Sequence, residues 1–227
     1  MSTFLGYVVV SLILVCAGVA LAAFRWHSRQ RLEPCWPRGF IVLDCETTGL
    51  DPRAHSLLSI GAVAPATGEK FYGECRVWTG AAIDVEALEV NGETLERAYD
   101  PEYWTEAELV REFVTWAQAQ GVVLTGGKNP GFDQSFIKSA WRRATGGSSA
   151  PEDRWPLSHR TVCLHSLAWG WALQHRPDVF ASNRVKADDL YVMMGLSREP
   201  RPHHALTGAT HELEAFRFLL RSHGGAQ

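Results

Sequence analysis

Phe40-Ile-Val-Leu-Asp44-Cys45-Glu46-Thr47-Thr48-Gly49-Leu50 joins an apolar run to two acidic residues and a Thr-Thr-Gly turn. The apolar run is typical of a buried central strand, which we expect over residues 40–47. Because side chains alternate between the two faces of a strand, Asp44 and Glu46 would point the same way. Two neighbouring carboxylates repel each other unless a positive charge lies between them, and a divalent cation is the usual one. The alternative is a solvated strand end before a turn.

The composition narrows the classes of function. The chain has 227 residues, which leaves room for one domain of ordinary size and an appendage. Its formal net charge of −3 argues against a protein that holds nucleic acid through bulk positive charge, so any such contact would be local to a site. The five cysteines include no C-x-x-C pair. This argues against a structural zinc site or a disulfide framework and is typical of a reducing compartment.

An uncharged apolar run covers residues 4–24 and has the length that a helix needs to cross a bilayer. No Lys or Arg precedes the run, whereas Arg25, Arg29 and Arg31 follow it at once. By the positive-inside rule, this pattern predicts a single-pass transmembrane anchor over residues 1–24, with the rest of the chain in the cytoplasm. The alternatives are a cleaved signal peptide, because Ala20-Leu21-Ala22 resembles a cleavage site, and a buried soluble helix.

Residues 25–38 carry two prolines among charges and predict a linker, which is followed by a folded domain over residues 39–227. Alternating and apolar runs predict strands at residues 40–47, 57–64, 71–77, 122–125 and 159–163. Helical spacing predicts helices at residues 105–120, after Asp133 to about residue 143, and at 165–174, 186–195 and 205–221. Thr105 and Glu108 form a capping box at the first of these helices. Three strands followed by alternating helix and strand indicate a mixed α/β sheet with helices on its faces.

Two further stretches carry groups suited to the same chemistry as the acidic pair. Asn129-Pro-Gly-Phe132-Asp133 places an aspartate at the head of a helix that follows a strand. Pro202-His203-His204-Ala205-Leu206 places two histidines at the entry to the last helix. Carboxylates can hold a divalent cation, and a neutral histidine can accept a proton near neutral pH.

In this order, the three stretches resemble the motifs of the DEDD exonuclease superfamily, in its histidine-bearing branch. That branch includes ribonuclease T, oligoribonuclease-like enzymes and the proofreading subunits of bacterial replicative polymerases. The motif D-x-E-T-T-G-L is present in full at residues 44–50, and N-x-x-F-D is present at residues 129–133. The third motif, H-x-A-x-x-D-A, is present only in part, at residues 203–209. The resemblance covers essentially the whole chain after the apolar run.

The resemblance implies a ribonuclease-H-like fold and removal of nucleotides from the 3′ ends of single-stranded DNA or RNA. It also implies two Mg²⁺ or Mn²⁺ ions, which suit hard oxygen ligands better than zinc would. Asp44 would bridge the two ions, Glu46 would hold the ion that activates water, and Asp133 would complete the shell of the other ion.

The same register gives roles to three residues outside the metal ligands. His203 would be the general base, because its pKa lies close to the working pH. The alternatives are that both histidines are exposed loop residues, or that His204 is the base. Thr47 would offer backbone contacts to the terminal nucleotide. Phe132 would lie against its base or sugar, or would only pack a helix onto the sheet.

The sequence departs from the family at the last aspartate, which falls on Gly208. Either one ligand is lost or another residue replaces it. Glu212 lies four residues later on the same helical face, but one turn rises about 5.4 Å, so a helix shift or an intervening water would be needed. The alternative for Glu212 is a solvated helix charge.

Three functions follow from this departure. The first is an active 3′-to-5′ exonuclease tethered to the membrane, and the second is a decayed exonuclease that binds nucleic-acid ends or protein partners. The third is a structural membrane protein with a spectator domain. Lys138, Arg142 and Arg143 form an unspecific basic patch that would steer a strand of nucleic acid. Homodimers are common in the superfamily, and the sequence leaves both the oligomeric state and the choice between DNA and RNA open.

Overall fold

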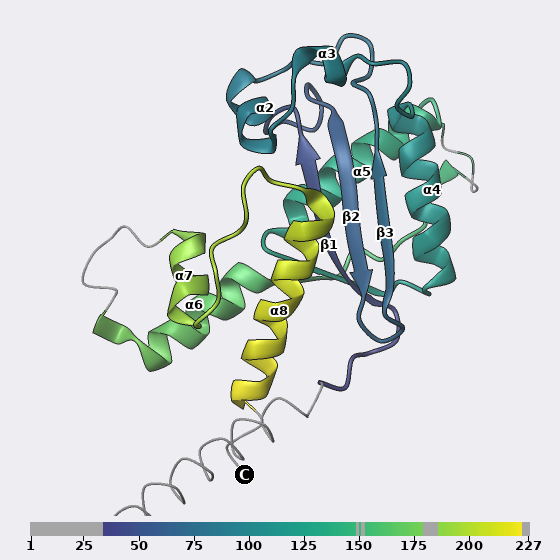
Figure 1. Ribbon diagram of the computed structural model, residues 1–227. Helices are drawn as coiled ribbons and strands as arrows, with labels where there is room; N and C mark the ends of the chain where they lie inside the picture. The colour runs from purple at the N-terminus through teal and green to yellow at the C-terminus, as the bar shows by residue number, and fades with distance from the viewer. Residues whose placement is uncertain (1–33, 149, 151–152, 179–185, 224–227) are drawn as a thin grey trace, which may run out of the picture. The chain divides into compact units, whose positions relative to one another are not determined.

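A central sheet organises the part of the chain that this computed structural model describes, namely residues 34–148, 150, 153–178 and 186–223. Its five strands are β1 (Phe40–Thr47), β2 (Leu57–Ala64), β3 (Glu69–Glu74), β4 (Leu124–Gly127) and β5 (Thr161–Cys163), in the order β3-β2-β1-β4-β5. Figure 1 shows β1, β2 and β3 side by side. The β1–β2 and β2–β3 pairs are antiparallel, whereas β4 runs parallel to both β1 and β5. The expected mixed α/β class is confirmed.

Helices cover both faces of the sheet within the compact unit Trp36–Leu219 (Figure 1). One face packs against α4 (Glu106–Ala119) and α5 (Pro130–Ala144). The other packs against α6 (Leu164–His175), α7 (Ala187–Met193) and α8 (Ala205–His223). Two short helices that the sequence did not predict, α2 (Val85–Asn91) and α3 (Leu95–Ala98), follow β3. The predicted capping box is confirmed, since Thr105 and Glu108 cap α4 reciprocally.

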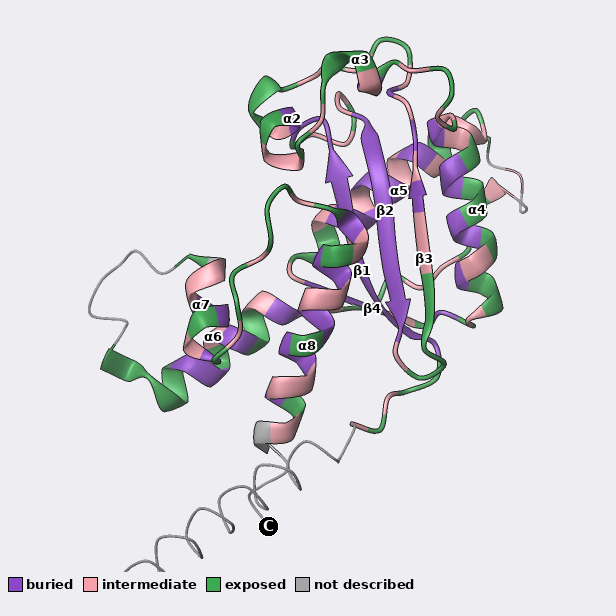
Figure 2. Cartoon of the chain, in the orientation of Figure 1, coloured by how far each residue is buried: buried purple, intermediate pink, exposed green. Residues whose placement is uncertain are grey.

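The side chains of β1 alternate between two hydrophobic cores. Ile41, Leu43 and Cys45 lie in the core with α4 and α5, whereas Phe40 and Val42 lie in the core with α6, α7 and α8. Figure 2 shows β1 and β2 buried almost throughout, unlike the edge strand β3. A slip of one residue would exchange the two cores, so burial fixes the register of β1.

The start of α8 lies directly against the sheet because β2 carries a glycine there. A Cβ atom on Gly61 would lie 2.2 Å from the backbone carbon of Ala205 and from the backbone nitrogen of Leu206. No larger residue fits between the two backbones without moving the helix. Gly61 therefore brings the first turn of α8 close to the end of β1.

The strand predicted at residues 122–125 is displaced along the chain, because β4 spans Leu124–Gly127. The predicted strand ended at Thr125, before Gly126 and Gly127. In the structure, a Cβ atom on Gly126 would meet the ring of Phe40 at 2.6 Å, and one on Gly127 would meet the carbonyl oxygen of Leu43 at 2.8 Å. Close tertiary packing, rather than a turn, requires glycine here. The strand expected at residues 71–77 is displaced in the opposite direction, since β3 begins at Glu69 and ends at Glu74.

The predicted anchor, residues 1–24, and most of the predicted linker lie outside the described residues. Within the described part of the chain, every helix is too short or too polar to cross a membrane.

Candidate active site

Asp44 and Glu46 lie on the face of β1 that α8 covers, as strand alternation predicts. Glu46 is only 8% exposed, whereas Asp44 retains partial exposure. Burial raises the pKa of Glu46 to about 8, and the charges of Glu199 and Asp133 act in the same direction. Loss of solvation also raises the pKa of Asp44 well above its usual value. The negative charges of Glu212 and Asp133 raise it further. The solvated strand end considered from the sequence is therefore wrong.

Asp133 joins this pair from the first turn of α5, where it is 5% exposed. Pairing between β1 and β4 ends at Val42 and Gly126, which leaves the amide of Cys45 free of the parallel ladder. That amide donates a hydrogen bond to Asp133 Oδ1 at 3.1 Å. Burial raises the pKa of Asp133 to about 7, even though the hydrogen bond from Cys45 lowers it. The two acidic motifs, 88 residues apart, thus meet at one end of the sheet.

Glu212 enters the same cluster from α8 and is 4% exposed. Burial raises its pKa strongly, the charge of Asp133 adds to this, and a hydrogen bond from the backbone amide of Lys128 acts in the opposite direction. The hypothesis of a solvated helix charge is therefore wrong for Glu212. Glu212 lies on the buried face of α8 between Gly208 and Phe216, a position at the edge of the apolar stripe that the sequence alone leaves open.

Two charged residues that sequence reasoning missed lie beside the acids. Lys128 Nζ donates to Glu199 Oε2 at 3.0 Å and lies 3.7 Å from a carboxylate oxygen of Asp188. Glu199 Oε1 lies 3.7 Å from His203 Nδ1. The charge of Lys128 lowers the pKa of three of the acids, namely Glu46, Asp133 and Glu212. Lys128 directly precedes the Asn129 motif, but Glu199 lies outside any regular element, where periodicity gives no signal.

The side chains of the two histidines at the start of α8 have different surroundings. The backbone amide of His203 donates to the carbonyl oxygen of Val90 at 3.1 Å, and its side chain is about a quarter exposed beside Glu199. His204 is exposed, and its ring stacks on Tyr72 with centroids 4.4 Å apart. Since Glu199 also raises the pKa of Asp44 and Glu46, it connects His203, rather than His204, to the acidic cluster.

The two residues expected to contact a nucleotide have partners within the protein. Thr47 is buried, its hydroxyl donates to the carbonyl oxygen of Gly49 at 2.7 Å, and its own carbonyl accepts from Asn91 at 3.1 Å. The Phe132 ring packs on Phe136 with centroids 4.9 Å apart and remains partly exposed. The packing role considered for Phe132 is thus present. The expected contacts of Thr47 and Phe132 with a nucleotide stay predictions.

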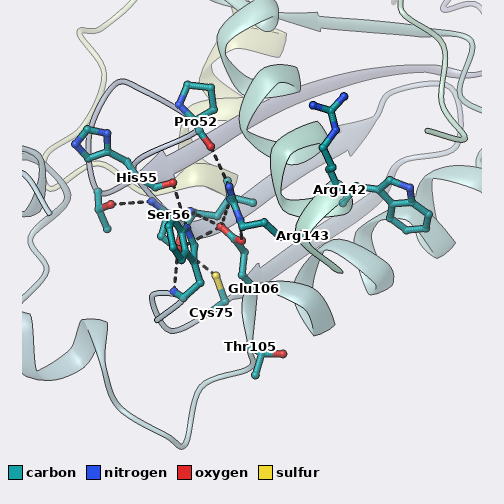
Figure 3. A network of polar contacts seen from close by, with 12 residues as sticks. Pro52, His55, Ser56, Cys75, Thr105, Glu106, Arg142 and Arg143 are labelled. Atoms are coloured by element: carbon teal, nitrogen blue, oxygen red, sulfur yellow. Dashed lines mark hydrogen bonds and ion pairs between the residues drawn. The ribbon is translucent and has the colours of Figure 1, made fainter. Parts of the chain in front are cut away.

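The expected basic patch is wrong for Arg143, because its guanidinium is bound inside the protein. Arg143 pairs with both carboxylate oxygens of the buried Glu106, at 2.7 and 2.8 Å, and donates to the carbonyl oxygen of Pro52 at 3.0 Å (Figure 3). Glu106 also accepts from Ser56 and from the amide of Leu57. Arg143 therefore ties α5 to α4 and to the loop before β2.

The acidic residues of the cluster are of the type that binds a divalent cation, but their side chains are not close enough together to bind one as placed. Within the described residues, no group of three His, Cys, Asp or Glu side chains could hold a metal ion as placed. In the same part of the chain, Glu46 Oε1 and Glu212 Oε2 are buried without a hydrogen-bond partner. Buried carboxylate oxygens need a proton, a donor or a cation. The all-oxygen donor set therefore has the chemistry of a site for a hard divalent cation.

Comparison with known proteins reveals the fold. No family model and no curated protein matches the chain. Exonuclease I of E. coli, in complex with a 5cy-dT13 oligonucleotide, superposes with a TM-score of 0.60 and 16% identity over 79% of this chain and 40% of that chain. Another structure of exonuclease I gives a TM-score of 0.62 at 15% identity, covering 81% and 42% of the two chains. Exonuclease I of Methylocaldum szegediense gives 0.62 at 18% identity, covering 79% and 40%.

The chain thus spans about two fifths of the length of these exonucleases. At such low identity the likeness is one of fold. A mixed α/β sheet flanked by helices, as in exonuclease I, agrees with the fold class expected from the order of strands and helices along the chain.

Proposed function

We propose that this protein is a metal-dependent 3′-to-5′ exonuclease acting on single-stranded nucleic acid. The observation that carries the proposal is the convergence of buried carboxylates from β1, α5 and α8, two of which have oxygens without a hydrogen-bond partner among the described residues. The fold gives further support, because exonuclease I structures with dT13 and dA16 oligonucleotides share it. These neighbours make single-stranded DNA the first substrate to test, ahead of RNA.

In this proposal Asp44, Glu46 and Asp133 hold two Mg²⁺ or Mn²⁺ ions. When bound, the ions would supply an activated water and neutralise charge on the attacking and leaving oxygens of the phosphodiester. The positive charge of Lys128 lowers the pKa of both Glu46 and Asp133, but burial still leaves both pKa values raised. A divalent cation would relieve the repulsion that burial intensifies.

His203 is proposed as the general base. Its Nδ1 faces Glu199, which leaves Nε2 to accept the proton of the attacking water. Glu199 would stabilise the positive ring that results, while its second oxygen stays bound to Lys128. Thr47 and Phe132 are proposed to contact the terminal nucleotide, Thr47 through its backbone and Phe132 through the exposed part of its ring.

A direct assay tests this function. The full-length protein, purified in detergent, is incubated with Mn²⁺ and a 5′-labelled single-stranded oligonucleotide, with an EDTA control. We expect stepwise shortening from the 3′ end that EDTA abolishes. If a folded protein retains the oligonucleotide without shortening it, the proposal fails in favour of an end-binding protein, a function that the glycine at position 208 favours. If it neither shortens nor binds the oligonucleotide, both functions fail.

We also propose that residues 1–24 anchor the domain on the cytoplasmic side of a membrane. The support is the uncharged run with Arg25, Arg29 and Arg31 directly after it. After expression in cells, the protein should resist carbonate extraction from membranes. A protease added outside intact cells should leave the domain whole. Release of a shortened soluble chain would instead indicate a cleaved signal peptide.

A further inference from the structure

Gly208 lies where the DEDD pattern has its last aspartate, and the structure shows why no side chain is present there. A Cβ atom on Gly208 would lie 1.9 Å from Asp44 Oδ2 and 3.3 Å from Glu199 Oε1. The carboxylate of Asp44 thus occupies the space that a side chain at position 208 would enter. As placed, Asp44 and an aspartate at position 208 exclude each other.

One helical turn further along α8, Glu212 points into the same cluster. Its side chain packs beside β4, where a Cβ atom on Gly127 would lie 3.5 Å from Glu212 Oε2. That oxygen is buried and, among the described residues, has no hydrogen-bond partner. Among the neighbouring charges, that of Glu212 raises the pKa of Asp44 the most. Gly208 and Glu212 therefore share one face of the helix, which meets the acids of β1 and α5.

Lys128 does not satisfy the free oxygen of Glu212. Its ammonium donates to Glu199 at 3.0 Å and has Asp188 as a second partner at 3.7 Å. The backbone amide of Lys128 lowers the pKa of Glu212, but Glu212 Oε2 remains buried without a hydrogen-bond partner among the described residues. A buried carboxylate oxygen without a donor is suited to a cation.

We propose that Glu212 is the fourth carboxylate of the divalent-cation site and replaces the aspartate missing at position 208. The inference rests on the proposed function for the location of the site, but it concerns metal binding, which can be measured without catalysis. Gly208 and Glu212 form one arrangement: the glycine leaves room for Asp44, and the longer glutamate reaches the site from the next turn. Carboxylate oxygens select Mg²⁺ or Mn²⁺ as the ion.

The test compares Glu212→Gln with Glu214→Gln in the full-length protein. Glu214 makes the matched control, since it lies on the same helix with a half-exposed side chain paired to Arg217. Mn²⁺ affinity is measured from the electron paramagnetic resonance signal of free Mn²⁺, and the melting temperature is measured with and without Mn²⁺. We expect Glu212→Gln to weaken Mn²⁺ binding by more than about tenfold, and Glu214→Gln to leave it unchanged.

The melting temperature separates a ligand from a structural residue. If Glu212 is a ligand, Glu212→Gln removes the cost of burying an acidic group and raises the melting temperature in EDTA, while the increase caused by Mn²⁺ shrinks. A lower melting temperature in EDTA with an unchanged Mn²⁺ response would overturn the proposal. If the glutamine variant does not fold, Glu212→Asp, which shortens the reach by one methylene, replaces it. Wild-type Mn²⁺ affinity in that variant would also overturn the proposal.

Failure of the inference is distinguishable from failure of the proposed function. A wild-type protein that binds Mn²⁺ through Glu212 but does not shorten an oligonucleotide refutes the exonuclease and supports the ligand. A wild-type protein that shortens an oligonucleotide, together with a Glu212→Gln variant of unchanged Mn²⁺ affinity, refutes only the ligand.

Discussion

Asp133 Oδ1 accepts a hydrogen bond from the backbone amide of Cys45 at 3.1 Å, and this bond fixes the head of α5 against β1 between Asp44 and Glu46. Cys45 itself faces the core under α4 and α5, so its neighbours on the strand turn toward α8. A single strand therefore presents acids to one helix and binds an acid of another through its backbone. This geometry, rather than any one motif, brings the carboxylates together.

The first prediction concerns Asp133→Asn. An asparagine can still accept the hydrogen bond from Cys45, so the fold should be kept, while one negative charge leaves the cluster. We expect nuclease activity to fall by more than about 100-fold, because the loss of a ligand should exceed that of an outer-shell partner. The melting temperature in EDTA should not fall. Measured rates within tenfold of the wild type would contradict a role for Asp133 in metal binding.

The second prediction is the pH dependence of stability without metal. Burial raises the pKa of Glu46 from 4.5 to about 8 and that of Asp133 from 3.8 to about 7. In this window the folded state holds protons that the unfolded state has lost, so the free energy of unfolding falls as the pH rises from about 4 to about 8. The melting temperature in EDTA should therefore be higher at pH 5 than at pH 8.

Mn²⁺ should oppose this pH dependence of the melting temperature. A cation competes with protons for the carboxylates, so its stabilising effect should be larger at pH 8 than at pH 5. The check is a pair of melting curves at each pH, one in EDTA and one in Mn²⁺. If the curves in EDTA coincide at the two pH values, the acids are not buried together in solution.

The third prediction separates a structural arginine from a surface one. Arg143→Ala leaves Glu106, which is 4% exposed, without its ion-pair partner. Removal of one partner of a buried pair costs about 3–5 kcal/mol, and the partial exposure of Arg143 places the expected loss near the lower value. Arg142→Ala is the control, since Arg142 is exposed and a surface change costs about 0.5 kcal/mol or less. Urea unfolding measures both, and equal losses would contradict the role of Arg143.

Much of the framework was predictable from local patterns. The apolar run before Asp44 and the alternation of a strand correctly predicted that Asp44 and Glu46 share a face, and the capping box correctly predicted the start of α4. These predictions succeed because neighbours along the chain determine them. The position of β4 failed for the opposite reason, since Gly126 is required by the ring of Phe40, which is remote in sequence.

The site was predictable only where residues stand on regular elements. Glu199 and Lys128 lie in connections, so no period indicates which way they point. Glu212 lies on a helix, but the sequence pattern is equally compatible with an exposed charge at the edge of the apolar stripe. Its direction depends on Gly61 and Gly208, which let α8 approach the sheet closely. Such close approaches between helix and sheet depend on contacts between residues that are distant in sequence, so local sequence patterns do not predict them.

The last prediction distinguishes the two adjacent histidines. His203 lies beside Glu199 near the acids, whereas the ring of His204 is stacked on Tyr72. His203→Ala should lower kcat by about 10²–10⁴-fold, the usual contribution of a general base, with oligonucleotide binding and Mn²⁺ affinity retained. His204→Ala, the matched control, should change kcat by only a few-fold. Single-turnover rates and fluorescence anisotropy measure the two effects separately. A larger loss in His204→Ala would assign the base to His204, and equal small effects would mean that neither histidine accepts the proton.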